Sequence, residues 1–321
     1  MFRVLDLESG ETGYLIEDNG WKFEHADLDP DYILMPSFFN AHTHVGDSFI
    51  EAPRISLERL VGPNGYKFKK LHETDERTIL RGMKKAIDLI KRTSSTSLEF
   101  REGGIDGYRL YMKADPERIL TALSRPLNLE EAEMLAELSG GFNFSSTRDH
   151  SFSFLEECRD IARKRKLIFA IHAGEVNEKD VDAALNLEPD FLIHMNRADG
   201  KQLRRAMDME IYIVSCLRSN AFFGVFNLKN YRILSEYERW LIGTDNAMIA
   251  TPSMVDELKF GSCFLECESL FRAGTGNPFF DSHMLVRYDK IIDPEKITCS
   301  VIRRIESCDI KLILRENISR G

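Results

Sequence analysis

Residues 167–175 read LIFAIHAGE, and residues 190–196 read DFLIHMN; together these two stretches decide the fold. Each is an apolar run of strand length that ends at a histidine, His172 in the first and His194 in the second. The runs start 23 residues apart, which is room for one strand, one helix and two turns. This spacing predicts a compact unit in which two parallel strands are joined through a helix.

The same pattern extends in both directions along the chain. Between the runs lie amphipathic stretches, such as residues 75–93, 151–166 and 198–209. Strand-like runs start at Ile33, Thr96, Arg118, Phe142, Leu167, Asp190, Ile211 and Trp240. Strands that alternate with helical patterns predict a parallel sheet covered by helices. No glycine-rich nucleotide-binding loop follows any of these strands. We therefore expect a closed (β/α)₈ barrel over residues 33–275 and not an open doubly wound sheet.

The two ends of the chain lie outside this pattern. Residues 1–32 and 276–321 are expected to form a small β-subdomain, with strands at 2–7, within 13–25, and at 284–289, 297–302 and 310–314. The step from the first barrel strand to the second is 63 residues, far longer than the others. Its segment 46–74 is a candidate lid over the catalytic end of the barrel, and the alternative is an inert surface loop.

Composition limits the classes of partner. The chain has 321 residues, of which 43% are hydrophobic, and its 52 acidic and 43 basic side chains give a net charge of −9. Such a balance argues against binding to a nucleic-acid backbone, which is mostly electrostatic. No apolar run approaches the ~20 residues that span a bilayer, and the N-terminus lacks the layout of a signal peptide. We expect a cytoplasmic protein that acts on a small molecule; the sequence leaves homo-oligomerisation open.

Histidines and one aspartate stand where the strands of a barrel present an active site. His42 and His44, two residues apart after the first strand, project to one face of an extended chain and can reach one ion. His172 and His194 end later strands, where either alone could be a structural histidine. Asp245 follows the last strand and needs a partner to offset its desolvation. Three histidine nitrogens and one carboxylate oxygen would suit Zn²⁺ or Fe²⁺.

Glu175 lies three residues beyond His172, on the loop after that strand. A divalent ion lowers the pKa of a bound water, and a carboxylate above the ion can carry the water's proton. The alternative is a glutamate that is simply solvated on a loop. We expect Glu175 to act as a proton shuttle.

The ordered motifs N-A-H-T-H, H-A-G-E, a later strand-end histidine, C-x-x-S-N and G-T-D-N resemble the amidohydrolase superfamily. The resemblance covers residues 33–275 and is strongest to its deaminases, which act on adenosine, cytosine, guanine or triazine-type substrates. It implies a barrel with one metal ion held by His42, His44, His172 and Asp245. It also implies that Glu175 shuttles protons and that His194 orients the attacking water.

Two departures from the family pattern bear on the site. Dinuclear members carry a bridging lysine at the end of strand four, and this chain reads FNFSSTRDH there, which favours a single ion. In the motif after strand seven, Leu217 stands where relatives have proline. Ser219 and Asn220 are therefore weaker candidates for contacts with the substrate.

The resemblance favours hydrolytic deamination of an amino-substituted heterocycle, such as a nucleobase or nucleoside, by a metal-activated water. Zn²⁺ is the preferred ion and Fe²⁺ the alternative. In this mechanism Glu175, His194 and Asp245 are the catalytic residues. The alternatives are an amidohydrolase that opens a cyclic amide or imidazolone ring, and a barrel that has lost catalysis.

Charged residues follow strands two, three and four at the same barrel mouth: Arg101 with Glu102, Arg125, and Arg148 with Asp149. They are candidates for substrate contacts, or for a ring of structural ion pairs. If several arginines face the pocket, a substrate with a carboxylate or phosphate is expected, since guanidinium favours such groups.

Overall fold

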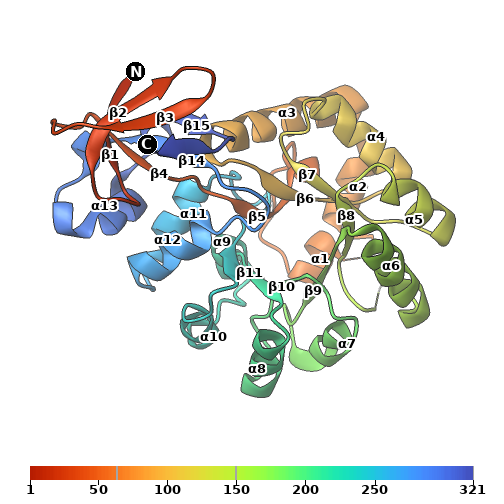
Figure 1. The fold of residues 1–321 in the computed structure, drawn as a ribbon. Helices are drawn as coiled ribbons and strands as arrows, with labels where there is room; N and C mark the ends of the chain where they lie inside the picture. The colour runs from red at the N-terminus through yellow and green to blue at the C-terminus, as the bar shows by residue number, and fades with distance from the viewer. Residues whose placement is uncertain (63, 149, 321) are drawn as a thin grey trace.

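The computed structural model describes residues 1–62, 64–148 and 150–320, and its strands form two separate sheets (Figure 1). One sheet has nine strands and is parallel throughout; the other has seven strands and is mixed. The chain is therefore a mixed α/β protein.

The nine-stranded sheet provides the framework of the molecule. Its strand order is β12-β11-β10-β9-β8-β7-β6-β5-β13. The strands are β5 (Asn40–His44), β6 (Ser97–Arg101), β7 (Thr121–Ser124), β8 (Gly141–Phe144), β9 (Ile168–Ala173), β10 (Phe191–His194), β11 (Tyr212–Ser215), β12 (Trp240–Ile242) and β13 (Asp245–Asn246). The last seven predicted strand positions match β6 to β12. Because every pairing is parallel, the carboxyl ends of these strands lie at one edge.

The prediction for the first strand is wrong in its position. Residues 33–36 belong to β4 (Tyr32–Pro36), which pairs with β1 and β14 of the other sheet. Proline has no N–H to extend a ladder, and the chain crosses from one sheet to the other over residues 36–39. The parallel sheet thus begins at Asn40, and the expected junction at residue 33 moves to this crossing.

The last predicted strand is split into two short pieces. After β12, Gly243 N donates to Ser215 O at 3.0 Å and Thr244 N donates to His42 O at 2.9 Å. The chain then continues as β13, which pairs with β5. A Cβ atom at Gly243 would lie 2.7 Å from Cβ of His42, so only glycine fits where the chain passes this histidine.

Helices surround the parallel sheet (Figure 1). They are α1 (Leu57–Val61), α2 (Tyr66–Glu73), α3 (Glu76–Thr93), α4 (Gly104–Ala114), α5 (Leu129–Ala136), α6 (Phe152–Arg165), α7 (Val181–Asn186), α8 (Gly200–Asp208), α9 (Leu217–Phe222), α10 (Leu228–Leu234), α11 (Met254–Gly261) and α12 (Cys267–Thr275). The predicted helical stretches correspond to α3, α6 and α8. In α3 the buried side chains recur at helical spacing, at Ile79, Met83, Ala86, Ile87 and Ile90.

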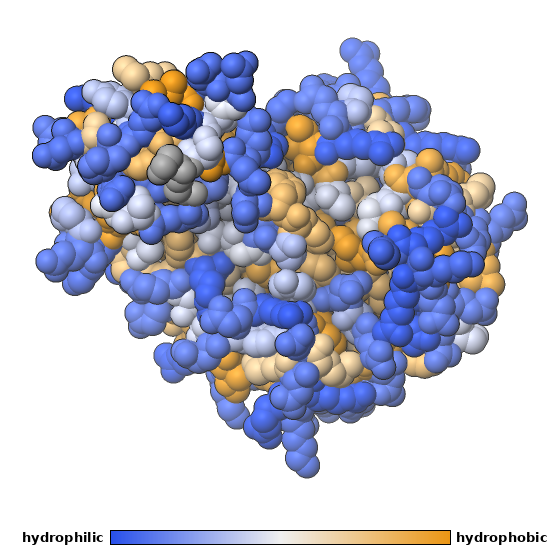
Figure 2. All heavy atoms as spheres, viewed as in Figure 1, coloured by the Kyte–Doolittle hydropathy of each residue, from blue (hydrophilic) through white to orange (hydrophobic). Residues whose placement is uncertain are grey.

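Polar side chains cover most of the face shown in Figure 2, and apolar side chains gather toward its middle. The inside of the parallel sheet is filled with fully buried apolar residues, among them Phe39, Leu98, Phe100, Leu123, Ile193 and Val214. Within the described part of the chain, no helix is both long and apolar enough to cross a membrane.

The seven-stranded sheet is built from both ends of the chain, in the order β15-β14-β4-β1-β2-β3-β16. Besides β4, it contains β1 (Phe2–Asp6), β2 (Thr12–Glu17), β3 (Trp21–His25), β14 (His283–Arg287), β15 (Ile310–Leu314) and β16 (Ile318–Arg320). The predicted strand at 297–302 is wrong, because these residues form helix α13 (Ile297–Arg304). A short β-branched run misled the prediction, while Pro294 before it and two arginines in its last turn are helix signals.

Short 3-10 turns join several elements. They are η1 (Val45–Asp47), η2 (Glu178–Asp180), η3 (Tyr288–Lys290), η4 (Pro294–Lys296) and η5 (Ser307–Asp309). The long step after β5 contains η1, α1 and α2 and returns to the sheet through α3. Leu60 of α1 packs with Ile50 and Met248 in a small cluster apart from the main core.

Candidate active site

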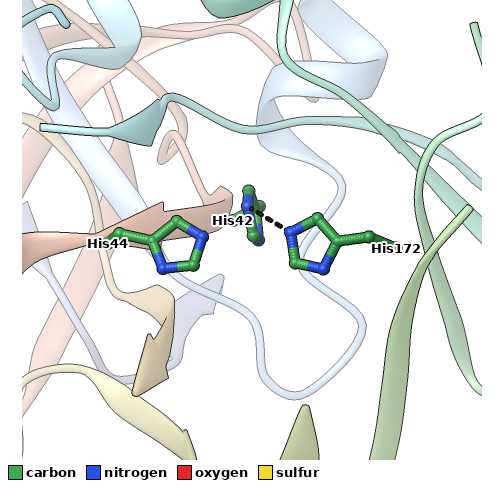
Figure 3. A group of neighbouring side chains, drawn as sticks. All are labelled: His42, His44 and His172. Carbon is green, nitrogen blue, oxygen red and sulfur yellow. Dashed lines mark hydrogen bonds between the residues drawn. The ribbon is translucent and has the colours of Figure 1, made fainter. Parts of the chain in front are cut away.

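Three histidines from two strands converge at the carboxyl edge of the parallel sheet (Figure 3). His42 and His44 come from β5, where side chains two residues apart share a face, and His172 comes from β9. All three are buried, and a ring nitrogen of each lies within 4.8 Å of the others. Nε2 of His42 is 3.3 Å from Nε2 of His172.

Backbone carbonyls orient two of these imidazoles. Nδ1 of His44 donates to the carbonyl of Phe100 at 3.0 Å, and Nδ1 of His172 donates to the carbonyl of Phe144 at 2.9 Å. A carbonyl only accepts, so the proton of each neutral ring sits on Nδ1 and the Nε2 lone pair faces the cluster. Burial lowers the pKa of His42 to about 3 and that of His172 well below its ordinary value. All these features favour neutral rings that can bind a metal.

Asp245 brings a carboxylate beside His42 and His44. Its Oδ1 lies 3.2 Å from Nε2 of His42 and 3.6 Å from Nε2 of His44. Ser219 Oγ donates to Oδ2 at 2.5 Å, and Asn246 Nδ2 donates to Oδ1 at 2.8 Å. Burial opposes the charge of Asp245, but the hydrogen bond from His42 and the neighbouring histidines hold its pKa well below the usual range.

The donor set fits a divalent metal ion. Three imidazoles lie within 4.8 Å of one another through their ring nitrogens, and a buried carboxylate oxygen adjoins two of them, a set of ligand types that Zn²⁺ and Fe²⁺ accept. The carbonyls of Phe100 and Phe144 supply the outer hydrogen bonds that metal-binding histidines commonly make. Sequence reasoning did not assign Cys216, whose sulfur lies within 4.8 Å of ligand atoms of His42 and Asp245. Burial raises the pKa of this thiol well above its ordinary value, and a protonated thiol is a poor ligand.

Glu175, which follows β9, and His194, which ends β10, lie beside this cluster. Oε1 of Glu175 lies 3.5 Å from Nε2 of His194, and both residues group with Asp245 within 4.8 Å. Burial raises the pKa of Glu175, although the nearby His194 acts to lower it. A carboxyl with a raised pKa, held beside an imidazole, is suited to proton transfer.

A cavity of about 350 Å³ opens over these groups. Its wall includes His44, His172, Glu175, His194 and Asp245, so the predicted catalytic groups share one space. A larger, more open hollow of about 810 Å³ is lined by residues from the opposite end of the strands, and its described lining includes none of the predicted site residues. The smaller cavity is therefore the candidate active site.

The segment 46–74 forms part of the cavity wall. Leu57, Val61 and Phe68 contribute apolar surface from α1 and α2. Lys67 of α2 is buried, and its Nζ lies 2.5 Å from Oε1 of Glu102 and 3.4 Å from Oδ2 of Asp47. Burial acts to lower the pKa of Lys67, but these two carboxylates raise it above its ordinary value. Sequence reasoning missed Lys67, because no local signal marks a contact with a residue 35 positions away.

The charged candidates at the sheet edge separate into two groups. Glu102 and Arg125 line the cavity, and Arg125 Nη2 donates to Asn143 Oδ1 at 3.3 Å. Arg101 is buried outside the cavity lining, and its Nη1 lies 3.8 Å from Oε1 of Glu99. Arg148 is exposed and also outside the lining, and Asp149 lies outside the described residues.

Ser219 and Asn220 support the site from behind. Ser219 is buried and holds Asp245, as described above. Asn220 Nδ2 donates to Oδ1 of Asn196 at 3.1 Å and to the hydroxyl of Tyr231 at 2.8 Å. Neither residue is among the described residues that line the cavity.

Comparison with known proteins adds a family to this geometry. No protein-family model matches the chain. A protein of Archaeoglobus fulgidus named "Putative aminohydrolase" is 46% identical over 267 residues, which are 82% of this chain and 78% of that protein. The match covers most of both chains at an identity that establishes common descent.

Solved structures of three enzymes share the fold at low sequence identity. An adenosine deaminase of Xanthomonas campestris with bound zinc has a TM-score of 0.70 at 14% identity, over 89% of this chain and 80% of that chain. A guanine deaminase of C. acetobutylicum with bound guanine has a TM-score of 0.67 at 12% identity, over 94% and 90%. The zinc complex of the atrazine chlorohydrolase of Arthrobacter aurescens has a TM-score of 0.71 at 12% identity, over 98% and 92%. The chain belongs to the amidohydrolase superfamily, whose deaminases and chlorohydrolases are its structural neighbours.

Proposed function

We propose that this chain is a metal-dependent aminohydrolase that releases ammonia from an amino-substituted heterocycle, such as a nucleobase or nucleoside. The observation that carries the proposal is a cluster of three histidines beside Asp245, at a cavity that is also lined by Glu175 and His194. The similarity to a protein named as an aminohydrolase supports the class of reaction, hydrolysis of carbon–nitrogen bonds other than peptide bonds.

We further propose the framework that positions these groups. β12 pairs with β11, and β13 pairs with β5. Because only two residues separate β12 from β13 in the chain, these pairings support closure of the parallel sheet into a (β/α)₈ barrel. His42, His44, His172 and Asp245 would hold one divalent ion, Zn²⁺ in preference to Fe²⁺. When bound, such an ion would lower the pKa of a water molecule toward neutrality.

The protein's own groups then carry out the transfer steps. Glu175 accepts a proton from the attacking water and delivers it to a ring nitrogen of the substrate. His194 and Asp245 orient that water by hydrogen bonds, because both lie beside Glu175 at the cavity wall. Attack at the carbon that bears the amino group gives a tetrahedral adduct. The proton of the adduct's new hydroxyl passes to the amino group, the carbon–nitrogen bond breaks to release ammonia, and a carbonyl forms. The apolar surface of α1 and α2 limits access of bulk water.

The test combines metal analysis with an assay for ammonia. The purified chain is analysed for zinc and iron and then offered purines, pyrimidines and pterins, with detection of ammonia and of ring-opened products. A Glu175→Gln variant retains the size of the side chain but cannot shuttle a proton. Glu178→Gln, an exposed change on the same loop, is its matched control.

We expect about one equivalent of metal in all three proteins. The Glu175→Gln variant should lose about 10²- to 10⁴-fold in turnover, the usual contribution of a general acid–base group, while Glu178→Gln stays close to wild type. Ring-opened products without ammonia would instead indicate a cyclic amidohydrolase. A folded protein that takes up neither zinc nor iron would refute the proposed function.

A further inference from the structure

Glu102 is a cavity carboxylate that the proposed mechanism leaves without a role. It follows β6, is 8% exposed, and lines the same cavity as the histidine cluster. Its Oε1 lies 3.4 Å from Nδ1 of His44, so it stands on the side of that ring away from Nε2. A molecule that reaches the histidine cluster therefore shares its space with this carboxylate.

Lys67 holds only one of the two carboxylate oxygens of Glu102. The ammonium lies 2.5 Å from Oε1 of Glu102, 3.3 Å from Oδ1 of Asn246 and 3.4 Å from Oδ2 of Asp47. The ammonium donates hydrogen bonds to Glu102 and Asn246, and the Asp47 oxygen adds an ion pair. Among the described residues, no hydrogen-bond donor reaches Oε2 of Glu102, and a carboxylate oxygen can accept two bonds. Oε2 of Glu102 can therefore accept a hydrogen bond from a ligand in the cavity.

The arrangement of charge points away from an anionic ligand. Only Arg125 of the three predicted arginines lines the cavity, and Lys67 is occupied by its carboxylate partners. The condition for a carboxylate or phosphate substrate, several arginines facing the pocket, is not met. Leu57, Val61 and Phe68 make part of the remaining wall apolar, and this part suits the faces of a planar ring.

We propose that Glu102 binds the substrate by accepting a hydrogen bond from a ring N–H of an uncharged amino-heterocycle, with Lys67 as the positioning residue that aims it. This inference rests on the proposed function for the identity of the reacting ring. It names the substrate class more narrowly: a base with a free ring N–H edge and no phosphate. Because Lys67 belongs to α2, the segment 46–74 takes part in selecting the substrate as well as covering it.

The test measures equilibrium binding to the full-length, zinc-loaded chain in a Glu175→Gln background, in which turnover is suppressed. The probes are guanine, adenine, cytosine and pterin, each beside an analogue methylated at a ring N–H, together with the nucleoside monophosphates of the first three. Each pair is measured with Glu102 intact and with Glu102→Gln, which retains the shape of the side chain but removes its charge. Glu73→Gln removes an exposed carboxylate on α2 and is the control.

A hydrogen bond to a charged group contributes about 1.5–3 kcal/mol, which is about a 10- to 150-fold preference. With Glu102 present, we expect at least one base to bind that much more tightly than its methylated analogue. The Glu102→Gln change should reduce the preference to a few-fold, and Glu73→Gln should leave it unchanged. Bound zinc, measured in every variant, should stay at one equivalent, so a general loss of structure would be visible.

Three results would overturn the inference: a methylation penalty that survives Glu102→Gln, no binding of any base, or tighter binding of the nucleoside monophosphates than of the bases. Its failure differs from failure of the proposed function. If the bases bind with the expected preference but the wild-type chain releases no ammonia, the function fails and Glu102 keeps its role. If ammonia is released and Glu102→Gln does not change the preference for the unmethylated base, the proposed function stands and the role of Glu102 is refuted. Should Glu102→Gln lose its fold, the Lys67→Met, Glu102→Gln double variant provides the same comparison.

Discussion

Replacement of Lys67 by methionine should be among the most destabilising single changes near the site. Lys67 is 2% exposed and lies within 3.4 Å of two buried carboxylates, Glu102 and Asp47. Methionine fills a similar volume but leaves both acids without their cation. Removal of one partner from a buried ion pair costs about 3–5 kcal/mol, because the remaining charge is buried and uncompensated.

The neighbouring Lys70 provides the control within the same helix. Its side chain is 40% exposed and pairs with Glu73, which is 63% exposed. Exposed pairs of this kind contribute about 0–1 kcal/mol, so Lys70→Met should be close to neutral. The free energy of unfolding of both variants is measured by urea titration at neutral pH. Both changes remove one ammonium group from α2, so the difference between the two free energies of unfolding measures the effect of burial.

A second variant separates the loss of charge balance from the loss of packing. Adding Glu102→Gln to Lys67→Met removes one of the stranded charges and should recover about 1–3 kcal/mol. If the single variant is no less stable than Lys70→Met, the buried ion pair does not hold α2 in place. The same conclusion would follow if the addition of Glu102→Gln lowered the free energy of unfolding further.

Four further measurements test other features of the structure. Asp115 is buried and accepts three hydrogen bonds, so Asp115→Ala should cost about 2–5 kcal/mol by urea titration, while the exposed Asp106→Ala stays within about 0.5 kcal/mol. Burial raises the pKa of Glu99 to about 8, so the native protein retains a proton that the unfolded chain releases above pH 4.5. The melting temperature of the wild type should therefore fall between pH 4.5 and 8 relative to that of Glu99→Gln. A constant difference between the two melting temperatures across this range would contradict the prediction. Asp199 caps α8 through a reciprocal capping box, and Asp199→Ala should cost about 0.5–2 kcal/mol in thermal unfolding. Metal stripped with a chelator should lower the free energy of unfolding by about 2.7 kcal/mol relative to protein with free zinc at a hundred times its dissociation constant, and equal stabilities would count against a bound ion.

The order of the strands could be predicted because each follows from local pattern. The apolar runs before His172 and His194 are buried on both faces, so they read as continuous strands at a regular spacing. Ile33 begins a run of the same character, and its strand is also buried, but in the other sheet. Hydrophobicity records burial and not the partner, so the sequence could not assign this strand to its sheet.

The metal cluster could be predicted for the same local reason, and the substrate contacts could not. The alternation of side chains brings His42 and His44 to one face whatever lies around them. Arg101 ends β6 and Glu102 follows it, but only Glu102 lines the cavity. A Cβ atom on Gly46 would clash with the guanidinium of Arg101, so that side chain lies beneath the loop after β5. Which of the two side chains reaches the cavity therefore depends on a loop more than fifty residues away, and the sequence near Arg101 carries no sign of it.

Backbone strain connects the site to the stability of the whole chain. His194, Met195 and Asp245 have φ angles of 77°, 54° and 62°, in the left-handed region that non-glycine residues avoid. Each such residue costs about 1–3 kcal/mol, so together they use much of the roughly 5–15 kcal/mol net stability of a typical protein.

The surroundings of Asp245 show how such strain is sustained. Its carboxylate is held by Ser219 and Asn246, and its carbonyl accepts a hydrogen bond from Thr43 Oγ1 at 3.3 Å. The contacts from Ser219 and Thr43 come from two other segments, so relaxation of the backbone at Asp245 would disturb both. The deep apolar interior beneath the site provides the stability that such a conformation requires. The strained conformation thus turns the two side chains that the proposed chemistry needs, His194 and Asp245, toward one cavity, which a relaxed strand end would not do.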